Sequence, residues 1–496
     1  MAVVKVNGKP IEAPAGSLLS DILPENSIET PCGGRGSCGK CRVIAYGMLS
    51  EPSLEELACL TAQELSEGLR LACCIRIEGD CSVTMKAAGE SRIKMDNELP
   101  ELELHPAFTR YGAAVDVGTT TLAACLYGAD GERLAQAGGP NPQRSWGADV
   151  ISRVEAALKG EGPALAGAVR EGIGELLREL SHKAGIGPEL IDQVVITGNT
   201  VMLYLLTGTG PDSLARAPFM ADRLFGEELL AAELGLPCIH GTVYLPRCIS
   251  AFVGGDITTA LLYSGICNGA GTNLLADVGT NGEMALWHKG RLTCCSTAAG
   301  PAFEGAGLSM GLPGKAGAVD HAWVKDGSIV AHVLGEREPI GICGSGVVDA
   351  LACLLELGIL DDSGFLEEDP VMIAPPVCLT QQDIRMVQLA KSAVSAGIRT
   401  LIHRAGITCR EIDELAVAGG FGSYLDVGNA GKLGLLPGEL VQKVRVIGNA
   451  ALSGASMLLL NRDLRKYSES LAAQAETVDL STDPFFMEAY TEGMLF

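Results

Sequence analysis

The sequence lacks the long apolar segments that would place the protein in a membrane or mark it for export. No run of 18 apolar residues occurs in the 496 residues, so no membrane-spanning helix is predicted. The stretch from Met1 to Gly8 has no apolar core of the kind a signal peptide needs. Aromatic residues make up only 4% of the chain. We therefore expect a protein of the cytoplasm.

Positive charge is also in short supply. Thirty-seven Lys and Arg residues stand against 60 Asp and Glu, which leaves a formal net charge of −23. Such a balance argues against a nucleic-acid partner or an anionic membrane surface. It suits a soluble protein that docks on other proteins. The seven His residues are scattered, and each is interpreted as a structural or surface residue.

Cysteine is plentiful, and its placement predicts a metal centre. The 17 Cys are an odd number in a chain without an export signal, which suggests a reducing compartment and some thiolate ligands. Three of them, Cys32, Cys38 and Cys41, lie in a glycine-rich loop, and Cys73 follows far downstream. This is how a [2Fe–2S] cluster is held. A four-Cys zinc site is the weaker alternative, because zinc sites favour pairs of C-x₂-C.

The first 90 residues resemble a plant-type ferredoxin domain, which has the β-grasp fold. The resemblance rests on the cysteine loop and on the Leu-Ala-Cys sequence that ends at Cys73. Five residues separate Cys32 from Cys38, where the plant pattern has four. The motif favours Cys73 as the fourth ligand, with Cys74 as the alternative. An Asn7-Gly8 turn predicts a hairpin at the start of the chain.

One tetrapeptide, Asp-Val-Gly-Thr, occurs twice, at residues 116–119 and 277–280. Each copy lies between apolar stretches that read as two strands joined by a tight turn. The distance along the chain between the two copies, from residue 116 to residue 277, is much longer than the period of about 20–50 residues that marks a solenoid. The repeat therefore predicts two similar halves that face each other.

The residue types in both turns suit a bound phosphate. Glycine lets backbone N–H groups approach an anion, and the threonine hydroxyl adds a donor, as does Asn281 in the second copy. The aspartate can hold Mg²⁺, usually through water. Two such turns facing each other would grip a triphosphate from both sides. Two ordinary hairpins are the alternative, because Asp-x-Gly turns are common.

The region after Tyr111 alternates strands with helices, which indicates an α/β architecture. The apolar strand at 194–198 ends in a glycine turn, and 415–420 has the same character, so the repeat extends beyond the hairpins. The glycine turn that contains Gly344 opens a further helix. Small-residue turns at helix starts are ready-made anion sites, although any single one is more often plain turn chemistry.

The order of these motifs resembles the ASKHA superfamily, which includes acetate and sugar kinases, heat-shock chaperones and actin. The resemblance implies a duplicated ribonuclease H-like, actin-like fold that binds ATP and Mg²⁺ between its halves. It implies catalytic roles for Asp116 and Asp277, and phosphate loops that also contain Gly118, Thr119, Thr120, Gly279, Thr280 and Asn281. It further implies nucleotide contacts from Gly344 and an adenosine site at Gly419, Gly420 and Phe421.

A ferredoxin domain in front of such an ATPase resembles the reductive activators of corrinoid proteins over essentially the whole chain. The implied domains are residues 1–88, a linker at 89–108, and ASKHA halves at 109–268 and 269–496. The resemblance implies ATP-dependent transfer of one electron to cobalt on a corrinoid methyltransferase partner, an upstream low-potential electron donor, and a possible homodimer. No D-x-H-x-x-G string is present, so the corrinoid is expected on the partner.

Several questions remain open from the residues alone. Candidates to orient the attacking water are Asp149, Asp256, Glu283 and Glu304, although a capping or exposed carboxylate is the commoner role for each. Three other functions are compatible with the motifs. They are the activation of another redox enzyme such as a 2-hydroxyacyl-CoA dehydratase, a small-molecule kinase with a regulatory cluster, and a chaperone-like module whose cluster only stabilises the fold.

Overall fold

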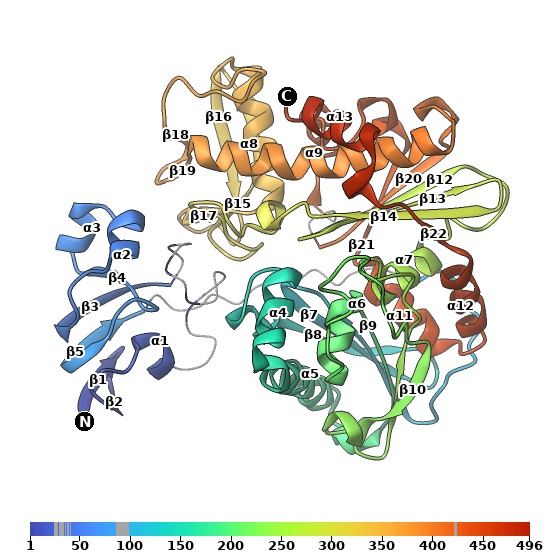
Figure 1. Cartoon of the computed structure of the whole chain (residues 1–496), viewed down its shortest axis with the longest axis horizontal. Coiled ribbons are helices and arrows are strands. Elements are labelled where there is room, and N and C mark those ends of the chain that lie inside the picture. Colours follow the sequence, from blue (N-terminus) through green and yellow to red (C-terminus); the bar gives the residue numbers. More distant parts are fainter. Residues whose placement is uncertain are drawn as a thin grey trace. The chain divides into compact units, whose positions relative to one another are not determined.

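The computed structural model describes residues 1–23, 28, 34, 36, 39, 41–85, 99–420 and 424–496. They belong to two compact units, one made of residues 1–90 and 142–159 and the other of residues 91–141 and 160–496 (Figure 1). Three predicted site residues, Cys32, Cys38 and Phe421, lie outside the described residues, as do residues 89–98 of the predicted linker. Within the described ranges, no helix is long and apolar enough to cross a bilayer.

The first unit contains a five-stranded sheet in the order β2-β1-β5-β3-β4. Its strands are β1 (Ala2–Val6), β2 (Lys9–Ala13), β3 (Arg42–Leu49), β4 (Leu69–Leu71) and β5 (Ile77–Thr84). The expected Asn7-Gly8 turn joins β1 to β2, and both residues have positive φ, as a tight hairpin requires. β1 runs parallel to β5, while β3 is antiparallel to both of its neighbours. The β-grasp prediction is confirmed.

A buried ion pair holds the strand that leads to Cys73. The unit's helices are α1 (Leu19–Ile22), α2 (Leu54–Cys59), α3 (Ala62–Ser66) and α4 (Val150–Ala156). Glu56 in α2 accepts two hydrogen bonds from Arg70, at 2.8 and 2.9 Å, and one from the N–H of Leu71 at 3.0 Å. Burial alone would raise the pKa of Glu56, but these donors hold it below its ordinary value.

Changing Arg70 to methionine is expected to destabilise the first unit by about 3 kcal/mol, because it leaves the Glu56 carboxylate buried without its cation. The loss is measured by urea unfolding followed through the visible absorbance of the cluster. Arg76→Met is the control, since the exposed Arg76 guanidinium donates, among the described residues, to the carbonyl of Gly16 alone, and it should cost less than about 1 kcal/mol. Equal losses in the two variants would contradict the assignment.

The second unit contains two sheets with the same strand order. The first is β10-β11-β9-β6-β7-β8 and the second is β21-β20-β12-β13-β14-β22. In each, three antiparallel strands follow one another, and the first of them pairs in parallel with a later strand, β9 or β20. The first sheet contains β6 (Tyr111–Val117), β7 (Thr121–Gly128), β8 (Arg133–Pro140), β9 (Ile191–Gly198), β10 (Glu227–Leu230) and β11 (Thr242–Leu245). The second contains β12 (Asn273–Val278), β13 (Gly282–His288), β14 (Arg291–Thr297), β20 (Glu414–Ala418), β21 (Val444–Gly448) and β22 (Glu476–Thr477).

The duplication extends to single contacts. A Cβ on Gly198, at the end of β9, would lie 2.7 Å from the carbonyl oxygen of Val117. A Cβ on Gly419, after β20, would lie 2.5 Å from the carbonyl oxygen of Val278. In both halves a glycine therefore lets the parallel strand approach the Asp-Val-Gly-Thr turn closely. The structure confirms that residues 194–198 and 415–420 occupy equivalent positions in the two halves, and it confirms the duplicated ASKHA fold.

Helices cover these sheets and connect the two halves. α5 (Gly162–Ala184) packs on β7 and β8, and α9 (Gln381–Arg404) packs on β13 and β14 (Figure 1). α7 (Gly255–Ser264) and α11 (Ala450–Leu460), one from each half, pack directly on each other. Further helices of this unit are α6 (Thr200–Thr207), α10 (Val427–Lys432), α12 (Leu464–Gln474) and α13 (Pro484–Glu492).

An insertion between β14 and α9 forms a separate layer of the second half. It contains β15 (Ala318–Lys325), β16 (Ser328–Val333), β17 (Gly341–Ile342), α8 (Gly344–Glu356), β18 (Val371–Ala374) and β19 (Val377–Leu379). A short 3₁₀ helix, η5 (Pro301–Glu304), precedes it. α8 packs against β15, and one apolar core joins this layer to the second sheet. α8 begins at Gly344 itself, so the Gly-Ser-Gly segment is its first turn.

Candidate functional site

The two Asp-Val-Gly-Thr turns meet at the face between the halves of the second unit. The hydroxyl oxygens of Thr120 and Thr280 are 3.1 Å apart, although 160 residues separate them. Thr120 donates to Oε2 of Glu304 at 2.9 Å, and the Thr280 hydroxyl donates to the same oxygen. One carboxylate thus joins a turn of the first half to a turn of the second.

The first turn is held by groups that lie far along the chain. Asn449, which caps α11, donates from Nδ2 to Oδ2 of Asp116 at 3.0 Å. Asn141 donates to the carbonyl of Gly118 at 2.8 Å. A Cβ on Gly118 would lie 2.8 Å from the carbonyl oxygen of Thr121, so only glycine fits this turn without a shift. The arrangement leaves the turn fixed from both sides.

Five carboxylates gather around these turns. Asp116 and Asp277 end the first strands of the two halves, Asp256 lies in the first turn of α7, and Glu283 and Glu304 come from the second half. Burial raises the pKa of Asp116 to about 6, although the hydrogen bond from Asn449 opposes the shift. Burial, then the charges of Asp116 and Glu304, raise the pKa of Asp277 to about 7.

Two further carboxylates of the cluster are also hard to ionise. Burial, then the charges of Asp116 and Asp277, raise the pKa of Asp256. Burial, then Asp256 and Asp277, raise the pKa of Glu283, whose carboxylate accepts hydrogen bonds from Asn199 and Asn281. Such a cluster attracts cations, because a bound cation lowers the cost of ionising all of its members. No set of three or more Asp, Glu, His or Cys side chains in the described ranges is arranged to hold a metal ion directly.

The predicted adenosine segment begins beside the second turn. Gly419 has a φ of +103°, and a Cβ there would lie 3.0 Å from Oδ1 of Asp277. Gly420 is exposed, and a Cβ there would meet nothing within 4 Å. The chain then reaches Asp426, which caps α10 and accepts the N–H of Asn429 at 2.8 Å. Gly419 therefore lies beside the acidic cluster, and α10 begins at Val427.

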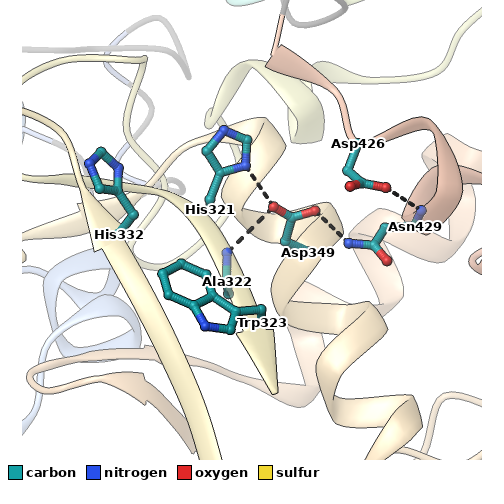
Figure 2. A pocket seen from close by; sticks show the side chains of 7 residues that line it. All are labelled: His321, Ala322, Trp323, His332, Asp349, Asp426 and Asn429. Atoms are coloured by element: carbon teal, nitrogen blue, oxygen red, sulfur yellow. Dashed lines mark hydrogen bonds and ion pairs between the residues drawn. The ribbon is translucent and has the colours of Figure 1, made fainter. Parts of the chain in front are cut away.

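An open pocket of about 500 Å³ lies where α10 meets the inserted layer. Figure 2 shows its lining residues, which are His321, Ala322, Trp323, His332, Asp349, Asp426 and Asn429. Asp349 of α8 accepts from Asn429 Nδ2 at 2.8 Å and is 2.8 Å from Nδ1 of His321 (Figure 2). Trp323 is 47% exposed in a chain that contains only three tryptophans. The pocket thus combines an accessible indole with fixed carboxylate and amide groups.

Two of the predicted cluster ligands meet in the first unit. The Sγ atoms of Cys41, at the start of β3, and Cys73, after β4, are 3.2 Å apart. This exceeds the length of about 2.05 Å of a disulfide and suits two neighbouring ligands of one cluster. The Cys74 Sγ lies 3.8 Å from that of Cys73 and is less buried. Cys59 donates instead to the carbonyl of Gly36 at 3.3 Å, so the described cysteines fit the expected cluster with Cys73 as a ligand.

Some predicted site residues lie apart from these contacts. Gly344 is buried at the first position of α8, and Asp349 of the same helix lines the pocket. Asp149 caps α4 in the first unit, where it accepts the N–H of Ser152 at 2.8 Å. Asn449 and Trp323 did not emerge from the sequence. The signal for Asn449 was a Gly-Asn pair directly after an apolar strand, which is typical of a helix cap.

Family models match the chain almost from end to end. A model of the 2Fe-2S iron-sulfur cluster binding domain matches residues 4–78. The RACo middle region matches residues 111–268, and the C-terminal domain of RACo, the ASKHA domain, matches residues 271–496. The second and third matches contain the two six-stranded sheets of the second unit.

Individual proteins agree with this result. Corrinoid activation enzyme RamQ of Eubacterium limosum is 35% identical over 78% of this chain and 70% of its own length. The [Co(II) methylated amine-specific corrinoid protein] reductase of Methanosarcina barkeri is 27% identical over 71% of this chain and 70% of its own length. A solved structure titled reductive activator for corrinoid, iron-sulfur protein superposes with a TM-score of 0.73 at 26% identity, covering 100% of this chain and 98% of that one. The chain therefore belongs to the RACo family, in which a [2Fe–2S] domain precedes an ASKHA domain.

Proposed function

We propose that this protein uses ATP to deliver single electrons to a corrinoid protein, reducing its inactive Co(II) to Co(I). The proposal is carried by the joining of two features in one chain. A ferredoxin-like unit brings Cys41 and Cys73 together, and a second unit brings two phosphate-type turns within hydrogen-bond distance. The names of the relatives point to the same activity.

ATP is required because the reduction potential of the cluster is too high for it to reduce Co(II) without help. When bound, the [2Fe–2S] cluster supplies a one-electron carrier held by Cys32, Cys38, Cys41 and Cys73. A plant-type cluster near about −400 mV cannot by itself drive the harder reduction of Co(II) to Co(I). ATP can assist only if it binds two conformations of the protein with unequal affinity. An upstream donor of low potential must reduce the oxidised cluster again after each electron transfer.

The phosphates and Mg²⁺ are assigned to the cluster of carboxylates and hydroxyls between the halves. Thr119, Thr120, Thr280 and Asn281 would donate to phosphate oxygens, as would the backbone around Gly118 and Gly279. Asp116 and Asp277 would hold Mg²⁺ through its water molecules, in keeping with the reluctance of Mg²⁺ to dehydrate. Hydroxyls that now donate to Glu304 would turn to the phosphate.

The adenosine is assigned to the pocket in Figure 2. A nucleotide whose phosphates lie at Asp277 would pass the open backbone of Gly419 and Gly420 and reach the start of α10. The pocket there has room for a nucleoside, and its exposed Trp323 offers a stacking surface for the base. Gly344 would contribute by placing α8, and so Asp349, at the pocket wall.

Changing Trp323 to alanine is expected to weaken ATP binding about 5- to 150-fold, because stacking of one base on an aromatic ring contributes about 1–3 kcal/mol. Trp323→Phe should keep most of the affinity. Inorganic tripolyphosphate should bind the parent protein and Trp323→Ala equally, since it has no base. Calorimetric titration with both ligands checks this, and equal weakening for the two would contradict the pocket assignment.

Among the candidate carboxylates, Asp256 is the best placed to orient the attacking water. Asp149 caps a helix, Glu304 accepts two threonine hydroxyls, and Glu283 is held by two asparagines. Among the described residues, only backbone N–H groups of its own helix turn donate to Asp256. Its side chain nevertheless interacts with the charges of Asp116 and Asp277. A raised pKa suits a group that accepts a proton near neutral pH.

The raised carboxylate pKa values predict how stability depends on pH. Protons stay bound to Asp116 up to about pH 6 and to Asp277 up to about pH 7, while the unfolded chain releases them near pH 4. The nucleotide-free protein should therefore lose stability as pH rises from about 4 to 7. Mg²⁺ with ATP should raise the melting temperature more at the higher pH. Asp116→Asn should show a smaller pH dependence of the melting temperature in the same thermal scans. An unchanged pH dependence would contradict the raised pKa of Asp116.

The function is tested by mixing the anaerobically reduced protein with a Co(II) corrinoid protein and recording visible spectra with and without ATP. Appearance of Co(I) only with ATP, and its absence in Cys38→Ser, is expected. Phosphorylation of a metabolite without any protein partner would instead indicate a kinase. ATP hydrolysis with client release that survives removal of the cluster would indicate a chaperone-like module.

A further inference from the structure

Helix α11 touches the candidate phosphate site at one end and the start of the second unit at the other. At its first end, Asn449 donates to Asp116. Its last residues, Leu459 and Leu460, accept backbone N–H groups from the segment 99–108, here called the strap. The 12 steps between successive residues from Asn449 to Asn461 span about 18 Å at the helical rise. One straight element therefore joins the two places.

The strap is attached to this far end by several bonds. The N–H groups of His105 and Ala107 donate to the carbonyls of Leu460 and Leu459 at 3.0 and 3.1 Å. The side chain of Asn461 donates to the carbonyl of Glu103 at 2.9 Å, and His105 lies 2.8 Å from Asp463. Leu99, Leu102 and Phe108 pack into the core that α11 forms with the first sheet. In sequence, the strap precedes β6 and follows the ferredoxin-like residues.

The helix is suited to move as a rigid body. Every residue of α11 is buried. At its centre, a Cβ on Gly454 would overlap the carbonyl of Thr259, so α7 and α11 are in backbone contact. α7 carries Asp256 in its first turn, and α11 begins at Asn449, so both helices start at the acidic cluster. Close packing of this kind passes a displacement along the element instead of absorbing it.

We propose that α11 couples nucleotide binding to the attachment of the strap at the far end of the helix. Mg²⁺ with ATP would engage the Asp116 carboxylate, and Asn449 would lose its acceptor. The start of α11 is then released, the helix shifts, and the bonds from His105 and Ala107 at its other end loosen. The strap would be hydrogen-bonded to the end of α11 without nucleotide and would lose these bonds when nucleotide binds. ATP binding would thereby change how the ferredoxin-like residues are attached to the second unit. The inference rests on the nucleotide site proposed above.

Hydrogen exchange measures the strap bonds directly, because the amides of His105 and Ala107 are their donors. The full chain with its cluster is compared under anaerobic conditions with and without Mg²⁺ and a non-hydrolysable ATP analogue. We expect these amides to exchange at least about fivefold faster with the analogue, the lower range of typical allosteric coupling. Calorimetry on the same samples reports analogue binding separately.

Two variants test the route. Asn449→Ser keeps a capping oxygen for α11 but is too short to reach Asp116, so its strap should exchange fast even without the analogue. Asn461→Ala loosens the strap far from the nucleotide. Since coupling is reciprocal, it should tighten analogue binding by the same factor of about five. Gln381→Ala is the control, because it removes a similar bond, from a side-chain amide to the carbonyl of Gly364, outside this route.

The outcomes are distinct. Faster exchange with the analogue, together with tighter binding in Asn461→Ala and no change in Gln381→Ala, supports the coupling. Analogue binding with unchanged or slower strap exchange overturns it, as does an analogue response in Asn449→Ser equal to that of the parent protein. If the analogue does not bind the parent protein at all, the proposed nucleotide site fails, and this inference fails with it.

Discussion

Cys73→Ser should lose the visible absorbance of the [2Fe–2S] cluster and all Co(II) reduction, whereas Cys74→Ser should keep both. The two cysteines are adjacent in sequence and both follow β4, yet they differ in surroundings. The Cys73 Sγ lies 3.2 Å from that of Cys41 and is buried with it in the core of the first unit. The Cys74 Sγ is less buried and lies 3.8 Å from the Sγ of Cys73.

The comparison needs a check that each variant folds. ATP binding shows that the second unit is folded, because the nucleotide residues all belong to it, and circular dichroism of the full chain reports the strands and helices of the first unit. Absorbance and electron paramagnetic resonance of the reduced protein report the cluster, and the cobalt spectrum reports activity. A cluster retained in Cys73→Ser and lost in Cys74→Ser would reverse the ligand assignment.

Asp256→Asn should lower the rate of ATP hydrolysis by about 10²- to 10⁴-fold, which is the usual contribution of a positioned general base. The amide has the same shape but cannot accept a proton from water. The same variant should bind ATP at least as tightly as the parent protein, because the amide keeps the shape of the carboxyl group and places no negative charge beside the phosphates, Asp116 and Asp277. A fall in kcat without a rise in Kd is therefore the expected signature.

Asp149→Asn is the matched control, since the sequence offered both aspartates as candidates. Asp149 accepts the N–H and hydroxyl of Ser152 at the start of α4, and asparagine caps a helix equally well. Its hydrolysis rate should stay within about twofold of the parent protein. Loss of hydrolysis in Asp149→Asn with little change in Asp256→Asn would move the catalytic role to Asp149.

Features that depend on residues adjacent along the chain could be predicted from the sequence. The Asn7-Gly8 turn, the strands around Asp116 and Asp277, and the glycine turns after β9 and β20 were predicted where they occur. Hairpin turns and buried strands follow from local backbone preferences and apolar runs. The duplication was visible because each half repeats the same local pattern. The family resemblance added the order of these patterns along the chain.

Other features required the folded chain. The motif favoured Cys73 over Cys74 as a ligand, but only the folded chain supplied the distance between Cys41 and Cys73 that supports this choice. Glu304 was one candidate among four until its position between Thr120 and Thr280 was known. The pocket at Trp323 arises where α10 meets a layer inserted about 100 residues earlier in the chain.

By itself the sequence determined which chemistry the protein carries: the cysteine loop, two phosphate-type turns, and the strands that place each turn at a sheet edge. Only the tertiary structure decided which groups act together, as in the bond between Asn449 and Asp116 across 333 residues. Local patterns specify turns and strands because their interactions lie within a few residues of the chain. Contacts between distant residues depend on how whole sheets and helices pack, and that packing leaves no pattern in any single stretch.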